Sequence, residues 1–157
     1  MNPEEFLTDN DIEFIRHEHS PLFTCEDVEN HPEKIPGLLY KSLFLQDKNR
    51  SFLVIIPDSK RLDLKQFRQI AQTSSKLSFG KDDELYAKLK ITPGSVSPFC
   101  ILNDPDQQVE FYIDHEVCEA EIVGFHPNDN TATLELTQQA FHKFLELIPH
   151  THTILHD

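Results

Sequence analysis

Cysteine is scarce in this sequence, and the three that are present form no pair or motif. Cys25, Cys100 and Cys118 are an odd number, and none belongs to a CxxC spacing. A small extracellular domain stabilised by disulfides would show an even, closely spaced set. We therefore interpret the three as reduced cysteines in a cytoplasmic protein, buried as small apolar side chains.

Long hydrophobic runs and a basic leader are also missing. The opening residues MNPEEFLTDND are acidic, whereas a secretory signal begins with a basic segment. No apolar run approaches the roughly 20 residues that span a bilayer. We expect neither a signal peptide nor a membrane segment.

Several catalytic patterns are absent as well. The sequence contains no P-loop, no nucleophilic triad and no HExxH motif. There are nine histidines, of which His150, His152 and His156 crowd the C-terminal end, but their spacing does not match a zinc site. We predict no metal and no cofactor, and any binding of nickel or zinc by these three histidines would be incidental.

The chain does have enough apolar residues for one folded domain. It has 157 residues, 38% of them hydrophobic, with 12 phenylalanines and no tryptophan. Hydrophobic periodicity, capping residues and turn signals predict mixed helices and strands, without a repeat or linker. Helices are predicted to begin at Asn2, Thr24, Asp63, residue 81 and Thr137, and strands at residues 12–19, 38–46, 51–57, 76–79, 99–104, 108–114, 119–125 and 131–137. Residues 149–157 are expected to be a frayed tail.

Charge is distributed unevenly along the chain. The net charge is −13, yet 11 of the 14 lysines and arginines lie between Lys41 and Lys90, against six acidic residues. That window therefore carries about +5 and the rest of the chain −18. Such asymmetry can give an acidic protein one basic, nucleic-acid-binding face, although a charge run can also be only a solvated surface. The candidate contacts are Lys60, Arg61, Lys65 and Arg68.

Lys41 interrupts an apolar strand. In LLYKSLFL, residues 38–45, alternation places Lys41 on one face with Leu43, and Tyr40 and Ser42 on the other. A lysine on an apolar face is costly unless its charge is paired or reaches water. Two readings stay open, an edge strand or the base of a pocket for an anionic ligand.

Two loops carry further polar groups. Gly94, Ser95, Val96, Ser97 and Pro98 form a loop that could direct backbone N–H groups at a carbonyl or phosphate oxygen, although most such loops are only turns. Residues 125–131, FHPNDNT, place His126, Asn128 and Thr131 at a tip between two strands, where a polar hairpin loop is the simpler interpretation.

Five blocks of the sequence resemble the prolyl-tRNA editing family, the YbaK/ProX-type aminoacyl-tRNA deacylases. They are HEHSPLFTCEDVE (17–29), IPGLLYKSLFLQDK (35–48), KLSFG (76–80), ITPGSVSPFCILND (91–104) and VGFHPNDNTATLEL (123–136), in the family's order. The resemblance spans roughly residues 3–148. It implies an α+β fold: one domain over residues 1–157 with a central, partly closed mixed sheet flanked by helices. The free-standing ProX branch is the most similar, and it removes alanine mischarged onto the proline tRNA.

The resemblance also implies roles for individual residues. Lys41 matches the family's pocket lysine, Gly94 to Pro98 match its G-x-x-x-P loop, and His126 lies in the matching F-H-P-N-x-N-T-A-T segment. We assign catalysis to Lys41, Gly94, Ser95 and His126, and substrate binding to Thr24, Ser42, Val96, Ser97, Pro98, Asn128 and Thr131. Ser42 stands where the family usually has Asn, which affects the expected amino-acid specificity more than the reaction type.

The expected partner is mischarged tRNA, with prolyl-tRNA synthetase as a further candidate and neither DNA nor membrane. Two other functional classes remain open from the sequence. One is a non-catalytic module that binds tRNA or a synthetase through the same cleft. The other is a hydrolase of small acyl esters or nucleotides, which the net charge of −13 favours.

Overall fold

The computed structural model describes residues 2–20, 37, 40–73 and 75–156. The helix predicted from Thr24 lies outside these ranges. The helices are α1 (Pro3–Asp9), α3 (Leu64–Ala71), α4 (Asp82–Leu89), α5 (His115–Glu119), α6 (Gln138–Leu147) and the 3-10 helices η1 (Pro93–Ser95) and η2 (Pro98–Asn103). The strands are β1 (Ile15–Glu18), β2 (Tyr40–Gln46), β3 (Ser51–Pro57), β4 (Ser78–Phe79), β5 (Val109–Asp114), β6 (Ile122–Phe125), β7 (Ala132–Thr137) and β8 (His152–Leu155).

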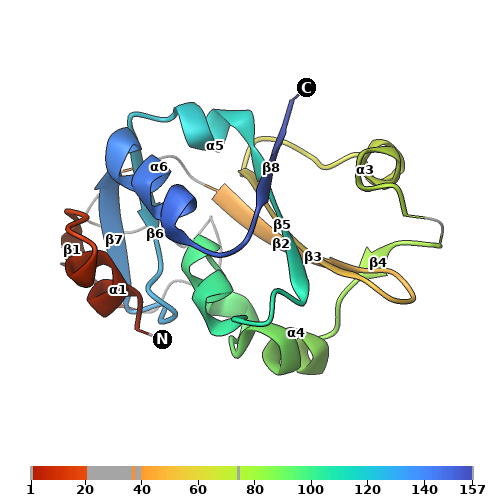
Figure 1. The fold of residues 1–157 in the computed structure, drawn as a ribbon, viewed down its shortest axis with the longest axis horizontal. Helices are drawn as coiled ribbons and strands as arrows, with labels where there is room; N and C mark the ends of the chain where they lie inside the picture. The colour runs from red at the N-terminus through yellow and green to blue at the C-terminus, as the bar shows by residue number, and fades with distance from the viewer. Residues whose placement is uncertain (1, 21–36, 38–39, 74, 157) are drawn as a thin grey trace.

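The strands form two sheets. The larger has the order β4-β2-β3-β5-β8, in which β2 pairs antiparallel with β3 and β4, while β3–β5 and β5–β8 are parallel. The smaller has the order β1-β7-β6 and is antiparallel throughout (Figure 1). The α+β class of the single domain is confirmed; in the part of the chain that the structure describes, the strands are divided between two sheets and form no closed barrel.

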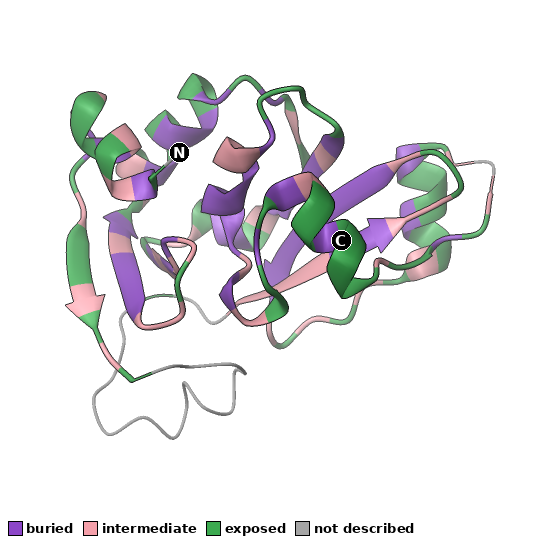
Figure 2. Cartoon of the chain, turned by 90° about the horizontal axis from the view of Figure 1, so that it is seen from below, coloured by how far each residue is buried: buried purple, intermediate pink, exposed green. Residues whose placement is uncertain are grey.

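Strand β3 lies at the centre of the fold because both of its faces are apolar. All seven of its residues are buried. Leu53 and Ile55 join the core shared with η2, α6 and the smaller sheet, whereas Val54 and Ile56 join a second core under α3. The centre of the larger sheet is therefore covered on both faces: β3 and nearly all of β5 are buried, whereas the outer turns of the helices are exposed (Figure 2).

The strand predicted at residues 99–104 is wrong, because these residues form the 3-10 helix η2. Pro98 occupies its first turn, where a missing N–H costs nothing and the fixed φ suits a helix. The hydroxyl of Ser97 caps the turn by accepting a hydrogen bond from the Phe99 N–H at 3.1 Å. The short helix α5 after Asp114 was also not anticipated.

The prediction of a frayed tail at residues 149–157 is wrong as well. Residues His152–Leu155 form β8, the parallel partner of β5 at the sheet edge. Leu155 is only 7% exposed and joins the core under α3. Backbone pairing and one buried leucine therefore order this mostly polar segment.

No helix in the described part of the chain is long and apolar enough to cross a membrane.

Candidate active site

Strand β2 contacts the Gly94–Pro98 loop through one of its faces. The Ser42 hydroxyl donates a hydrogen bond to the carbonyl oxygen of Val96 at 3.2 Å, and the Tyr40 hydroxyl lies 3.5 Å from the same oxygen. The Tyr40 ring packs edge-on against Phe125, with ring centroids 4.9 Å apart. The strand's alternation therefore brings Tyr40 and Ser42 together at the loop, and Tyr40 is a site residue that the motif comparison did not select.

The same loop is joined to the segment that carries His126. Ser97 is fully buried, and its hydroxyl donates to the His126 carbonyl oxygen at 2.7 Å. Ser95 is also buried, and its N–H donates to the carbonyl oxygen of Thr92, the residue that precedes η1. The predicted residues Gly94 to Pro98 thus run from η1 into η2, and hydrogen bonds join them to β2 and to His126, which follows β6.

His126 is half-buried and is held through one ring nitrogen. Its Nδ1 lies 2.9 Å from the Ala132 carbonyl oxygen, so Nδ1 carries the proton and donates it. Burial lowers the pKa of His126 below its ordinary value. The hydrogen bond to Ala132 raises this pKa, and the nearby His19 lowers it further. The imidazole is therefore neutral at pH 7, and Nε2 is an acceptor that has no partner among the described residues.

His19 lies beside His126, with ring centroids 6.0 Å apart. Its Nε2 is 2.8 Å from the Thr133 hydroxyl, and its backbone N–H donates to the Thr131 carbonyl oxygen. His19 follows β1 directly, and β1 pairs with β7, which contains Thr133. Thr133 was not predicted; its place on β7 opposite β1 is visible only once the strand pairing is known.

The tip between β6 and β7 is ordered by its own side chains. The Asp129 carboxylate accepts hydrogen bonds from the Thr131 N–H at 2.9 Å and hydroxyl at 2.8 Å, and these lower the pKa of Asp129. Asn128 has a left-handed φ of 63°. Thr131 therefore stabilises the tip through its contact with Asp129.

Lys41 does not share a face of β2 with these groups. It pairs in register with Ile56, and its face carries Leu45, which belongs to the core under α3, and Leu43, which packs against that core. Lys41 is half-buried, and it has no hydrogen bond or ion pair with any residue that the structure describes. Only Leu45 and Gln46 of β2 pair with β4, so the lysine lies on the part of the strand that β4 does not cover.

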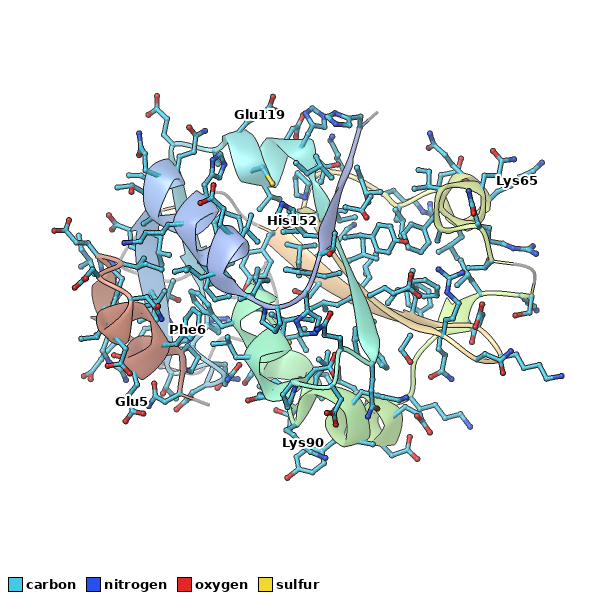
Figure 3. The ribbon with its side chains drawn as sticks, in the orientation of Figure 1. Glu5, Phe6, Lys65, Lys90, Glu119 and His152 are labelled. Atoms are coloured by element: carbon cyan, nitrogen blue, oxygen red, sulfur yellow. The ribbon has the colours of Figure 1, made fainter. Side chains whose placement is uncertain are left out.

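The predicted tRNA contacts differ in their surroundings. The Lys60 ammonium lies 3.1 Å from both carboxylate oxygens of the buried Asp114. Arg61, Lys65 and Arg68 are exposed, and Figure 3 shows Lys65 projecting outward from α3. Lys60 thus neutralises a buried carboxylate, whereas the other three side chains are accessible to a partner. Thr24 lies outside the described residues.

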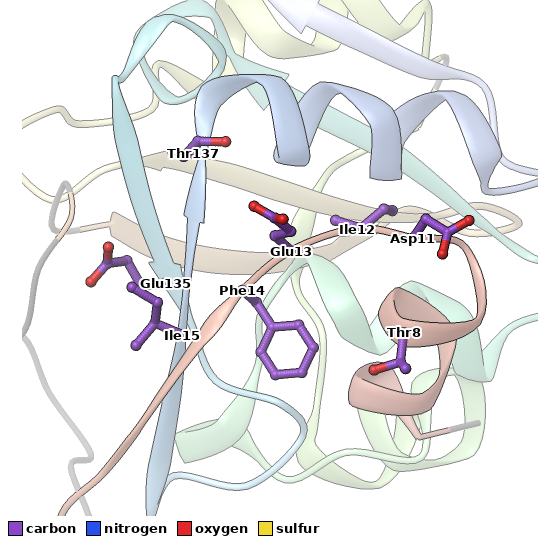
Figure 4. A pocket seen from close by; sticks show the side chains of 8 residues that line it. All are labelled: Thr8, Asp11, Ile12, Glu13, Phe14, Ile15, Glu135 and Thr137. Carbon is purple, nitrogen blue, oxygen red and sulfur yellow. The ribbon is translucent and has the colours of Figure 1, made fainter.

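A hollow of about 570 Å³ lies elsewhere, between α1, β1 and β7 (Figure 4). Its lining includes Asp11, Phe14 and Glu135 but none of the predicted site residues. Within residues 2–20, 37, 40–73 and 75–156, no group of three His, Cys, Asp or Glu side chains is arranged to hold a metal.

Comparisons with known proteins identify a family, related sequences and solved structures with a similar fold. The aminoacyl-tRNA editing domain family matches residues 19–144. The prolyl-tRNA editing protein ProX of Acetoanaerobium sticklandii is 37% identical over 137 residues, which cover 86% of this chain and 83% of the relative. The prolyl-tRNA synthetase associated domain-containing protein 1 of Xenopus laevis is 31% identical, covering 96% and 92%. A crystal structure described as a candidate trans-editing enzyme for prolyl-tRNA synthetase shares the fold, with a TM-score of 0.70 at 16% identity over 98% of this chain and 94% of that one.

The class defined by this match is the aminoacyl-tRNA deacylases, enzymes that hydrolyse the ester between an amino acid and its tRNA. The chain belongs to the aminoacyl-tRNA editing domain family.

Proposed function

We propose that the protein acts in trans to remove alanine from mischarged proline tRNA. The single observation that supports a hydrolytic site is the arrangement of His126: a neutral, partly desolvated imidazole with Nδ1–H held by Ala132 and Nε2 available as an acceptor. The names of the relatives in Acetoanaerobium and Xenopus support proline tRNA as the substrate and prolyl-tRNA synthetase as an associated protein. Alanine is the amino acid that the resemblance to the ProX branch implies.

The proposed reaction is addition of water to the ester carbonyl. Nε2 of His126 accepts a hydrogen bond from the attacking water or from the amino group of the amino acid, and so orients it. A new carbon–oxygen bond forms and the carbonyl oxygen becomes an oxyanion. When the bond to the ribose oxygen breaks, that oxygen receives the proton lost by the water, and the adjacent ribose hydroxyl assists this transfer. The products are free alanine and tRNA.

The remaining groups bind and orient the substrate. Backbone N–H groups of the Gly94–Pro98 loop are proposed to contact the ester carbonyl. Lys41 lies on the other face of β2, which is covered by α3, the helix that carries Lys65 and Arg68. We therefore propose that the Lys41 ammonium contacts a phosphate near the tRNA terminus and not the oxyanion.

The test is single-turnover hydrolysis with three substrates: alanyl-tRNA and prolyl-tRNA made with the same proline tRNA, and an alanine ethyl ester. We expect rapid release of alanine from the tRNA, slow release of proline and weak activity on the free ester. Binding of tRNA without hydrolysis would indicate a non-catalytic module. Equal activity on the free ester and the tRNA ester would indicate a general esterase.

A further inference from the structure

Two hydroxyl groups of β2 converge on one backbone oxygen of the Gly94–Pro98 loop. Ser42 Oγ lies 3.2 Å from the Val96 carbonyl oxygen, within hydrogen-bond distance. Tyr40 Oη lies 3.5 Å from it, which is long for a hydroxyl donor and indicates a weaker contact. Both side chains are half-buried. We call this three-group contact the Val96 anchor.

We propose that Ser42, with weaker assistance from Tyr40, is a positioning residue that sets the orientation of the peptide group between Val96 and Ser97. A peptide group is planar and trans, so its C=O and N–H point in opposite directions. Because the anchor holds the Val96 oxygen toward β2, the Ser97 N–H is directed away from β2. This N–H has no acceptor in the described part of the chain, although Ser97 is fully buried.

An unpaired N–H on a buried residue is unusual, because buried backbone donors are nearly always satisfied. The other side of this peptide is also fixed, since the Ser97 hydroxyl donates to the His126 carbonyl oxygen at 2.7 Å. Rotation of the peptide would break one of the two connections. The Ser97 N–H is thus a preoriented donor, chemically suited to a carbonyl oxygen that gains negative charge.

The inference rests on the proposed function, in which the incoming oxygen is that of the aminoacyl ester. It assigns Ser42 and Tyr40 to the geometry of the loop and not to contact with the substrate. Their loss should therefore lower the rate of the chemical step more than it weakens tRNA binding.

The experiment compares four variants with the wild-type protein. Ser42→Ala removes the stronger donor, and we expect the single-turnover rate on alanyl-tRNA to fall about 5-fold with KM unchanged, as for one neutral hydrogen bond. Tyr40→Phe keeps the ring against Phe125, and the rate should fall by at most about 3-fold. Ser42→Thr keeps a hydroxyl and should recover most of the rate lost in Ser42→Ala. Tyr86→Phe, at an exposed tyrosine on α4, is the matched control and should not change the rate.

A second measurement needs no activity. In two-dimensional ¹H–¹⁵N spectra, Ser42→Ala should shift the Ser97 amide resonance, because its peptide carbonyl loses a hydrogen bond, while Tyr86→Phe should leave it in place. A wild-type protein that releases no alanine would contradict the proposed function, yet the amide shift would still support the anchor. An unchanged rate together with an unchanged Ser97 amide in Ser42→Ala would overturn the inference.

Discussion

The burial of a single imidazole links protonation to activity and stability. His126 has a pKa below its ordinary value of 6.5, first because burial disfavours the cation. We expect kcat/KM for alanyl-tRNA to be level above pH 7 and to fall at lower pH, with an apparent pKa below 6.5, since a protonated Nε2 no longer accepts a hydrogen bond. Between the lowered pKa of His126 in the folded protein and its ordinary value of 6.5, this imidazole binds more protons in the unfolded chain than in the folded protein. The free energy of unfolding should therefore fall as pH falls below about 6.5.

The measurements are a pH–rate profile and an NMR titration of the His126 ring. A rate that rises as pH falls would mean that the cation is the active form. A titration midpoint above 6.5 would contradict the burial argument.

Lys41 provides a second test with a single residue. Lys41→Ala should lower kcat/KM for alanyl-tRNA about 10-fold, mainly through KM, and reduce the salt dependence of binding by about one phosphate contact. Hydrolysis of an alanine ethyl ester, which has no phosphate, should be affected less. Lys41→Arg should recover part of the loss, because a guanidinium also binds phosphate. Loss of kcat with unchanged KM on both substrates would instead assign the ammonium to the oxyanion.

At the scale of single elements, the sequence was informative where periodicity and caps agree. The helices beginning at Asn2, Asp63 and Thr137 could be predicted because these residue types favour the N-cap position. In the structure each of the three side chains accepts a hydrogen bond from a backbone N–H of the first turn. Residues 99–104 were misread, because a short apolar run after a proline fits either a strand or a 3-10 helix. Strand pairing decides such cases, and no local pattern gives it.

Strand β8 could not be predicted from local sequence, because it is ordered by its pairing with β5 and by the burial of Leu155. Leu155→Ala should lower the free energy of unfolding by about 2 kcal/mol, because Leu155 is 7% exposed in the core under α3. The neighbouring Ile154 is 40% exposed, so Ile154→Ala is a matched control with an expected change within about 0.5 kcal/mol. Denaturant unfolding measures both. Equal, small effects would mean that the segment frays in solution.

Only some of the site residues could be predicted from the sequence. The motifs select Ser42, the Gly94–Pro98 loop and His126, which the structure connects through the Val96 anchor and the Ser97 hydroxyl. Alternation already places Lys41 and Ser42 on opposite faces of the strand, but it does not say which of the two faces meets the loop. Partners such as Thr133 come from a strand remote in sequence.

At the scale of the whole molecule, the asymmetric charge predicts where tRNA lies. Separate Arg61→Glu, Lys65→Glu and Arg68→Glu changes should each weaken binding and reduce the slope of log affinity against log salt by about one unit per lost phosphate contact. Lys143→Glu, an exposed lysine on α6 outside the basic window, is the control and should change the slope less. Lys60 is a poor choice, since its loss would leave the buried Asp114 without its ion-pair partner. Unchanged slopes for all three changes would place the tRNA on another face.

We propose that the enzyme hydrolyses the aminoacyl ester at His126. The most direct measurement is the single-turnover rate of His126→Asn on alanyl-tRNA carrying the proline anticodon, next to a thermal melt. The Asn amide can replace Nδ1–H as the donor to Ala132, but it has no atom in the place of Nε2. We predict a rate about 100-fold below wild type with a nearly unchanged melting temperature, and no change in His156→Asn, an exposed histidine near the C-terminus. A folded His126→Asn protein with the wild-type rate would contradict the account.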